Sequence, residues 1–384
     1  MAAITSVQRP TFSVPGIRTT ISNRLEFVAL YLSKPAHIAS KPLIRAFATP
    51  IRPGKDGNWN SAIGEKIWRV FISTIGITTA PLTIGLALIG SLLDKTADLI
   101  KQKSYTHLRG SAPEKQEDDA YRLMTQNACM LWGGLPIPLG GMRPPSDRMD
   151  QFAKKICEED PDILVMQEMA FDPSYSLYQK IKNNYAHFFT RIGPNPPLME
   201  SGLFVASKYA ILQAGFIPFP KQLGIKRGAF WIETPKAFFF TTHMEFGPAE
   251  GKIQERQAQI DLIMKKIDEC KKEKPCFLLG DFNLDRSVGE HYQNMQISEN
   301  FHDPYFKKYP KLDEQSATCT DEITAYTLGN PPPQKKWEMV DYALLARGPH
   351  EAFKLDVDLV QMYNNEQPYK ALSDHRGLVL RASK

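Results

Sequence analysis

Apolar runs of strand length alternate with amphipathic stretches from about residue 120 to the end of the chain. The runs that we expect to form strands are Tyr121–Leu131, Ile163–Gln167, Gly202–Ser207, Ala229–Glu233, Phe238–His243, Cys276–Leu279, Met339–Leu345 and Gly377–Leu380. The stretches that we expect to form helices are Arg148–Glu158, Tyr175–Asn183 and Gly251–Lys271. Many short strands with intervening helices suit two sheets packed face to face under helical layers. The pattern therefore predicts an α/β fold of that architecture.

A long apolar segment precedes this part of the chain. Residues 70–93 contain no charged side chain, and about 20 apolar residues are enough to cross a bilayer. Pro81, in the middle of the segment, and the Thr and Gly residues around it favour the alternative of a buried helical hairpin. We expect the segment to be helical and to associate with a membrane, either by spanning it or by re-entering it.

The polar stretch Ala112–Asp119 separates the two patterns and predicts a linker. We therefore expect a membrane-association region at residues 1–115, with the apolar segment 70–93, and a catalytic domain at residues 116–384. Within the first region, Ile21–Leu32 is expected to form a short amphipathic helix. No compact apolar stretch with a small-residue cleavage site follows Met1, so we do not expect a conventional secretory signal peptide.

The composition narrows the class of partner. With 42% hydrophobic and 23% charged residues the chain is globular, which excludes bulk disorder. The net charge of +5 suits a phosphate-bearing partner or an anionic membrane but is a poor footprint for a nucleic-acid duplex, so no nucleic-acid partner is expected. None of the five cysteines lies in a Cys-x-x-Cys spacing, which favours reduced thiols. The oligomeric state is left open.

Polar side chains follow two of the expected strands. Asp281 and Asn283 lie in a Gly-Asp-Phe-Asn sequence, where strand alternation would point both to one face and turn Phe282 into the core. Asp281 can accept a proton or hold a hard cation, and Asn283 can donate to a phosphoryl oxygen, although such a pair also caps turns. Glu168 ends a buried run and must be solvated, paired or metal-bound, so it is a candidate metal ligand. Oxygen ligands favour magnesium over zinc.

Further candidates come from the other expected strand ends. His375, after Asp374, could transfer a proton near neutral pH if another group fixed its tautomer, and Asp341 in an apolar strand would serve that purpose. Asn127 and His243 end two further strands. Each of these residues alone is more often structural. Carboxylates, amides and imidazoles at five strand ends together indicate phosphoryl chemistry.

These segments, in this order, resemble the endonuclease/exonuclease/phosphatase superfamily over residues 120–384, which implies a four-layer α/β sandwich. Within it, the chain is most similar to the neutral sphingomyelinases. That similarity rests on the segments NACMLWGGLP, MQEMAFD, ESGLFVASKYAI, KRGAFW, TTHMEFG, LLGDFNLD, VDYALL and LSDHRGLVL. Membrane-bound members of this family carry hydrophobic N-terminal segments, and residues 67–100 fit that description.

The resemblance also implies a metal site. It makes Glu168 the holder of a divalent cation, with Asn127 nearby and Asp374 binding the metal or steering it. The implied cofactor is Mg²⁺, with Mn²⁺ as the alternative.

The same resemblance implies catalytic roles. His375 would be the general base that activates water, and Asp341 would orient it. Asp281 and Asn283 would position the nucleophile and the phosphate, while His243 would stabilise the charge that develops on phosphorus.

The implied function is hydrolysis of a membrane phospholipid or sphingolipid, with sphingomyelin giving ceramide and phosphocholine as the first hypothesis. The alternatives are an inositol-lipid phosphatase, whose signature usually has Gly-Asp-Leu-Asn-Tyr-Arg at this strand, another phosphodiesterase such as a nuclease, and a non-catalytic binding module. The chain departs from the family pattern at Glu245, where a second histidine is common, and at Lys226-Arg227-Gly228, where Ser-Lys-Gly is common. These departures leave the headgroup open. Residues 318–337 are expected to form a loop over the site or an uninformative insertion.

Overall fold

The structure is a computed structural model that describes residues 17–48, 60–101, 104–131, 142–193, 201–220, 227–247, 249–286, 288, 292–293, 295–311, 313, 315–320, 337–362 and 371–384. Its helices are α1 (Ile17–Ala48), α2 (Asn60–Lys101), α3 (Pro145–Glu159), α4 (Phe171–Ile181), α5 (Glu250–Cys270), α7 (Ile297–Asn300) and α8 (Pro304–Lys308). The expected loop at residues 318–337 lies mostly outside the described residues.

Fifteen strands are described: β1 (Thr106–Arg109), β2 (Ala120–Met130), β3 (Ile163–Met169), β4 (His187–Thr190), β5 (Phe204–Ser207), β6 (Gln213–Pro218), β7 (Gly228–Glu233), β8 (Phe238–His243), β9 (Cys276–Asp281), β10 (Phe301–His302), β11 (Cys319–Thr320), β12 (Trp337–Glu338), β13 (Asp341–Ala346), β14 (Lys354–Val360) and β15 (Gly377–Ser383). One large sheet has the order β1-β4-β5-β3-β2-β15-β14 and a second has the order β10-β13-β9-β8-β7-β6, while β11 and β12 pair with each other. The pairs β2–β3 and β8–β9 are parallel, and the other pairs in these two sheets are antiparallel.

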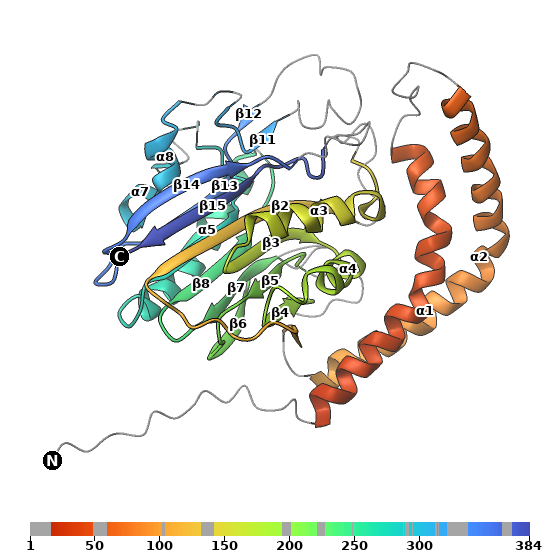
Figure 1. Cartoon of the computed structure of the whole chain (residues 1–384), viewed down its shortest axis with the longest axis horizontal. Coiled ribbons are helices and arrows are strands. Elements are labelled where there is room, and N and C mark those ends of the chain that lie inside the picture. Colours follow the sequence, from red (N-terminus) through yellow and green to blue (C-terminus); the bar gives the residue numbers. More distant parts are fainter. Residues whose placement is uncertain are drawn as a thin grey trace.

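The two sheets pack face to face under helices, which confirms the expected four-layer sandwich (Figure 1). Strand β9 has an apolar sequence that suits a central position in the sheet. Its successive side chains point to opposite faces, and each face is covered by a hydrophobic core. Phe277 and Leu279 pack between the sheets, whereas Cys276 and Leu278 pack under α5. On the other side of the molecule, α3 and α4 cover the outer face of the first sheet through residues such as Phe152.

All the expected strands and the three expected helices are present, with ends shifted by a few residues. The pattern missed the short helices α7 and α8 and seven strands, β1, β4, β6, β10, β11, β12 and β14. Four of these strands, β1, β6, β10 and β14, lie at the edges of the two large sheets, where a strand has one neighbour and tends to carry more polar side chains than a central strand. Strand β1 enters the first sheet ahead of residue 116, so this sheet uses residues on both sides of the expected domain boundary.

The N-terminal helices α1 and α2 run side by side along one flank of the sandwich (Figure 1). The expected short helix Ile21–Leu32 is part of the longer α1. Helix α2 continues through Pro81, so the segment 70–93 does not turn back on itself as a buried hairpin. The stretch Lys66–Ala97 is the part of the described chain that is long and apolar enough to cross a bilayer, and its most apolar window is 12% buried.

Apart from Arg69, the described side chains that α2 buries are small, and its exposed face carries large apolar ones. Its buried positions recur at every seventh residue, the spacing of a seam against a second helix, and they are Arg69, Gly76, Thr83, Gly90 and Ala97. A Cβ atom on Gly90 would lie 2.5 Å from Ser33 Oγ and 2.7 Å from the Ala29 oxygen in α1. The exposed side chains of α2 include Val70, Phe71, Ile75, Ile77, Leu82, Ile84, Leu88, Ile89 and Leu92. A helix pair in water has the opposite arrangement, with large apolar residues at the seam.

Gly280 should be intolerant of any side chain. A Cβ atom there would overlap the backbone oxygen of Thr242 on β8, and the residue has a φ of +153°. We expect Gly280→Ala to lower the free energy of unfolding by about 3 kcal/mol, because the paired strands must separate. The matched control Gly251→Ala, where a Cβ atom meets open space, should change it by less than about 1 kcal/mol. Urea unfolding of the detergent-solubilised chain measures both, and equal effects would contradict this account.

Candidate active site

The candidate site lies where strands of the two sheets end. Asn127 comes from β2 and Glu168 from β3. In the second sheet, His243 and Asp341 are the direct strand partners of Asp281 on either side. Strand register thus places these three groups in one row.

Asn127 connects the carboxylates of the two sheets. Its amide nitrogen donates to Glu168 Oε1 at 3.1 Å and to Asp281 Oδ2 at 2.9 Å. Its amide oxygen accepts from the backbone N–H of Cys129 at 3.1 Å and therefore points away from the two carboxylates. His243 Nε2 closes the cluster, 3.6 Å from Asp281 Oδ2 and 4.0 Å from Glu168 Oε1.

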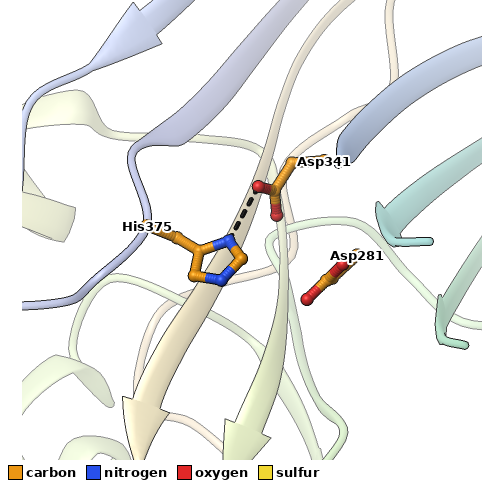
Figure 2. A group of neighbouring side chains, drawn as sticks. All are labelled: Asp281, Asp341 and His375. Carbon is orange, nitrogen blue, oxygen red and sulfur yellow. Dashed lines mark hydrogen bonds and ion pairs between the residues drawn. The ribbon is translucent and has the colours of Figure 1, made fainter. Parts of the chain in front are cut away.

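The second part of the site is a histidine–aspartate pair. His375 Nδ1 lies 2.8 Å from Asp341 Oδ2, and both side chains are buried beside Asp281 (Figure 2). Ser373 supports the pair, because its hydroxyl donates to the Asn127 backbone oxygen at 2.6 Å and accepts from the His375 N–H at 3.2 Å. The loop that carries His375 is therefore fixed to the strand that carries Asn127.

Asn283 takes a different position from the one that strand alternation predicts. Strand β9 ends at Asp281, and Asn283 adopts a φ of +49°, so the alternation does not reach it. Its backbone N–H donates to Asp281 Oδ1 at 2.8 Å, and its side-chain amide donates to the Met244 oxygen at 3.0 Å. The expected burial of Phe282 is confirmed, since its ring stacks on Tyr342 with centroids 4.3 Å apart.

Asp374 lies at the edge of the site. It is partly exposed, and the Ser373 hydroxyl is 3.4 Å from its Oδ1. Its negative charge is one reason for the raised pKa of Glu168, which places the two carboxylates near each other. Glu168 itself has a φ of +55°, a left-handed conformation that is rare outside functional sites for residues with a side chain.

Burial and mutual repulsion make the carboxylates reluctant to ionise. Burial, then the charges of Asp374 and Asp281, raise the pKa of Glu168 to about 7, against the hydrogen bond from Asn127. Burial, then the charge of Asp341, raise the pKa of Asp281 to about 6. A positive charge placed between such groups would relieve the repulsion.

The two histidines are shifted in opposite directions. Burial, followed by the positive charges of Arg227 and His375, lowers the pKa of His243 well below its usual value, so His243 is neutral at pH 7. Burial also lowers the pKa of His375, but Cys319 and Asp341 outweigh it and hold the net pKa well above its usual value. A neutral donor and a proton-carrying imidazole therefore flank Asp281.

The donor set fits a divalent cation. Glu168 and Asp281 offer oxygen atoms, as Mg²⁺ requires, and Asp341 Oδ1 is a buried oxygen with no hydrogen-bond partner among the described residues. Asp281, Asp341 and His375 also form a group whose ligand atoms lie within 4.8 Å of one another. Asn127 would need its amide turned over to present its oxygen. The residues of the site can thus hold a divalent metal ion.

Three supporting residues were not predicted from the sequence. Arg148 is buried and donates to the backbone oxygens of Ala128 and Cys129 at the end of β2 and of Leu372 ahead of β15, which joins these two segments beside the site. Arg286 donates to the Asp341 oxygen at 2.5 Å and pairs with Asp303 at 2.9 Å. Thr318 Oγ1 accepts from the Asp341 N–H at 3.2 Å. The only local signal for Arg286 in the sequence is its position three residues after the Gly-Asp-Phe-Asn segment.

A two-sheet sandwich with carboxylates, an amide and a histidine–aspartate pair at its shared edge is typical of phosphoesterases that use a divalent metal ion. The profile of the Endonuclease/Exonuclease/phosphatase family matches residues 124–375, and the chain belongs to this family. Its members hydrolyse phosphoric esters, so the chain is a hydrolase of the phosphodiesterase or phosphatase type.

Solved structures show the same fold. Beta toxin from Staphylococcus aureus is 17% identical with a TM-score of 0.56, and the match covers 69% of this chain and 100% of the toxin. SmcL is 17% identical with a TM-score of 0.55, covering 69% and 99%. TDP2 from D. rerio, complexed with a single-strand DNA product, is 17% identical with a TM-score of 0.55, covering 70% and 100%. No curated protein sequence matches the chain. At this identity the structures establish the fold alone.

The raised carboxylate pKa values predict how stability depends on pH. A carboxylate whose folded pKa lies above its unfolded value stabilises the fold at low pH, and this contribution is lost as pH rises through the folded pKa. For Glu168 and Asp281 that window runs from about pH 4 to about pH 7. We expect the metal-free protein to lose on the order of 2 kcal/mol of stability across it, and saturating Mg²⁺ to restore more at pH 8 than at pH 5.

Thermal melting with EDTA or Mg²⁺ at the two pH values measures this effect. Glu168→Gln should remove about half of the pH dependence, leaving the part due to Asp281, and most of the Mg²⁺ shift, whereas the exposed Glu250→Gln should remove neither. A Mg²⁺ shift that survives Glu168→Gln would exclude Glu168 as a ligand.

Proposed function

We propose that this protein is a membrane-associated lipid phosphodiesterase that depends on Mg²⁺, with Mn²⁺ as the alternative, and hydrolyses sphingomyelin to ceramide and phosphocholine. One observation carries the proposal: the Asp341–His375 pair faces the Asn127–Glu168–Asp281 cluster across a buried junction. That arrangement supplies a proton acceptor, oxygen ligands and hydrogen-bond donors around a single reacting phosphorus atom.

His375 is the general base in this proposal. Its Nδ1 is engaged by Asp341 at 2.8 Å, so the proton of the attacking water goes to Nε2. Asp341 holds the ring orientation and stabilises the imidazolium that forms. Proton transfer requires the neutral ring, and the raised pKa of His375 means that the rate should increase with pH.

The remaining groups position the phosphodiester. Asp281 directs the attacking water, and Asn283 holds the end of its strand through Met244. The neutral His243 donates to a phosphoryl oxygen as negative charge develops there. Glu168, with Asn127 and Asp374 beside it, would hold a divalent cation, which would supply Lewis-acid stabilisation of that charge.

Two features support a substrate embedded in a bilayer. Helix α2 directs its large apolar side chains outward and packs through small ones, as helices do in lipid, where small residues allow close approach. Next to the site, Phe246 is 65% exposed on a turn that follows His243. Arg256 holds that turn by donating to the oxygens of Glu245 and Gly247 at 3.0 and 2.8 Å. A fixed, exposed aromatic ring at the rim suits contact with an acyl chain.

The family also contains other phosphoesterases, and sphingomyelin itself rests on the resemblance of motifs such as MQEMAFD and LSDHRGLVL. The second candidate is an inositol-lipid phosphatase, whose usual Asn-Tyr-Arg after the catalytic strand is replaced here by Asn283-Leu284-Asp285. DNA hydrolysis is the third, because D. rerio TDP2, which has the same fold, was solved with a single-strand DNA product.

Removing the base or its partner should have distinct effects. His375→Ala should lower kcat by about 10²- to 10⁴-fold. Asp341→Asn should lower kcat as well and move the rising limb of the pH–rate profile to lower pH, because it removes a negative charge that raises the pKa of His375. His302→Ala, at a partly exposed histidine that pairs with Glu351, is the matched control and should leave the profile unchanged. Wild-type kcat in His375→Ala would exclude His375 as the base.

A substrate panel tests the reaction. With Mg²⁺ we expect purified protein to release phosphocholine from sphingomyelin in mixed micelles, and EDTA should stop the release. The same preparation should yield little inorganic phosphate from inositol-lipid phosphates and little product from single-strand DNA. Phosphate release without phosphocholine would favour the phosphatase, and DNA cleavage alone would favour the nuclease.

A further inference from the structure

Arg191 is a buried arginine whose guanidinium pairs with carboxylates outside the candidate site. It follows β4, its side chain is 3% exposed, and its φ of +49° is a left-handed conformation that favours glycine. An ionised side chain in such a position is costly unless it is paired. Its partners come from both N-terminal helices.

The guanidinium of Arg191 meets Asp94 of α2 through two hydrogen bonds. Nη2 donates to Asp94 Oδ2 at 2.7 Å, and Nη1 donates to Oδ1. Nη1 also lies 3.7 Å from Glu26 Oε1 of α1. Glu26 is buried in turn and accepts from the Thr106 hydroxyl of β1 at 2.9 Å. One cluster of charges therefore ties α1, α2 and the first sheet together.

The two helices are also fixed to each other at this level. The Ser22 hydroxyl of α1 donates to the Ala97 oxygen of α2 at 2.8 Å, and both residues are fully buried. Further along α1, a crevice of about 700 Å³ lies between that helix and α3 and α4, with Leu30 and Met149 among its lining residues. The charged cluster thus attaches the helix pair to the sandwich near the N-terminal end of α1 and the C-terminal end of α2. We call Arg191, Asp94 and Glu26 the root clamp.

The position of the root clamp along α2 is informative. Asp94 is the first charged residue after the uncharged segment 70–93, whose large side chains face outward. The clamp therefore holds the sandwich at one end of the surface that the proposed function assigns to lipid. A loose tether would let the active site face any direction, whereas a rigid attachment sets its height and orientation relative to that surface.

We propose that Arg191 is a positioning residue that, through Asp94 and Glu26, orients the active site toward phosphodiesters in the bilayer that holds α2. This inference rests on the proposed function. It requires that loss of the clamp impairs hydrolysis of bilayer lipids and spares hydrolysis of a small diester in water. A purely structural role would impair both.

The test uses the full-length protein in sphingomyelin-containing vesicles and, separately, with bis(p-nitrophenyl) phosphate, each with Mg²⁺. Arg191→Asp should lower vesicle hydrolysis by about tenfold or more and change hydrolysis of the soluble diester by less than about twofold. The charge swap Arg191→Asp with Asp94→Arg should recover most of the vesicle rate, because an opposite-charge pair forms again. Lys155→Asp, which breaks exposed pairs on α3, is the control and should leave both rates unchanged.

A second measurement tests whether the N-terminal helices stay attached to the sandwich, and it does not depend on enzymatic activity. In Arg191→Asp, amide hydrogen exchange should increase in α1, the end of α2 and β1, and the swap should reverse the increase. If Arg191→Asp does not fold, Arg191→Met removes the charge with less repulsion and should give the same selective loss.

The outcomes separate the two proposals. Equal losses on both substrates would overturn the clamp, because the Ser201–Gly202 segment, bonded to Ile192 and to Met169, could carry a distortion from Arg191 to Glu168. If the wild-type protein leaves sphingomyelin intact, the proposed substrate fails. Amide hydrogen exchange then tests the root clamp independently of the substrate. Unchanged amide protection in Arg191→Asp would overturn the root clamp.

Discussion

The desolvation of the neighbouring carboxylates of Glu168, Asp281 and Asp341, together with the repulsion between them, is the constraint to which the rest of the site responds. Strand register places Asp281 opposite Asp341, and Glu168 lies where the pairing of β2 with β3 becomes irregular. Hydrogen-bond donors offset this cost. The Asn127 amide donates to Glu168 and Asp281, and the His375 imidazole pairs with Asp341. The raised pKa values show that these donors compensate only in part. The uncompensated charge is what makes the site suitable for a cation.

The sandwich fixes the positions of these carboxylates. Its central core fixes the two sheets against each other, and the approach of β8 to β9 at Gly280 leaves no space for a side chain. Arg286 and Thr318 then hold the backbone of Asp341, while Arg148 holds the end of β2 next to Asn127. These supports are buried and hydrogen-bonded, so the site is rigid before a substrate arrives, which is the condition for electrostatic catalysis.

Much of this architecture could be predicted because the central strands are nearly continuous apolar runs that end in polar residues. The edge strands could not, since β14 alternates charged and apolar residues and pairs with one neighbour only. Within the site, period-two alternation located Asp281 but failed at Asn283, where the strand had already ended and the backbone turns left-handed. Arg148 and Arg191 were not predicted because their partners are backbone oxygens and distant helices, and such pairings leave no local pattern. The residues that recur at every seventh position of α2 can be located in the sequence, but the sequence does not show that they face α1.

Asp341, Asp281 and His243 lie side by side because three neighbouring strands are in register. Side chains on a strand alternate between faces, so a slip of one residue in β9 would move Asp281 into the apolar core and bring Gly280 or Phe282 to the site. A misaligned sheet is therefore both unstable and inactive. This row of residues makes catalytic competence a direct report on correct folding, because a partly folded chain would lack the aligned side chains and would not act as an uncontrolled hydrolase.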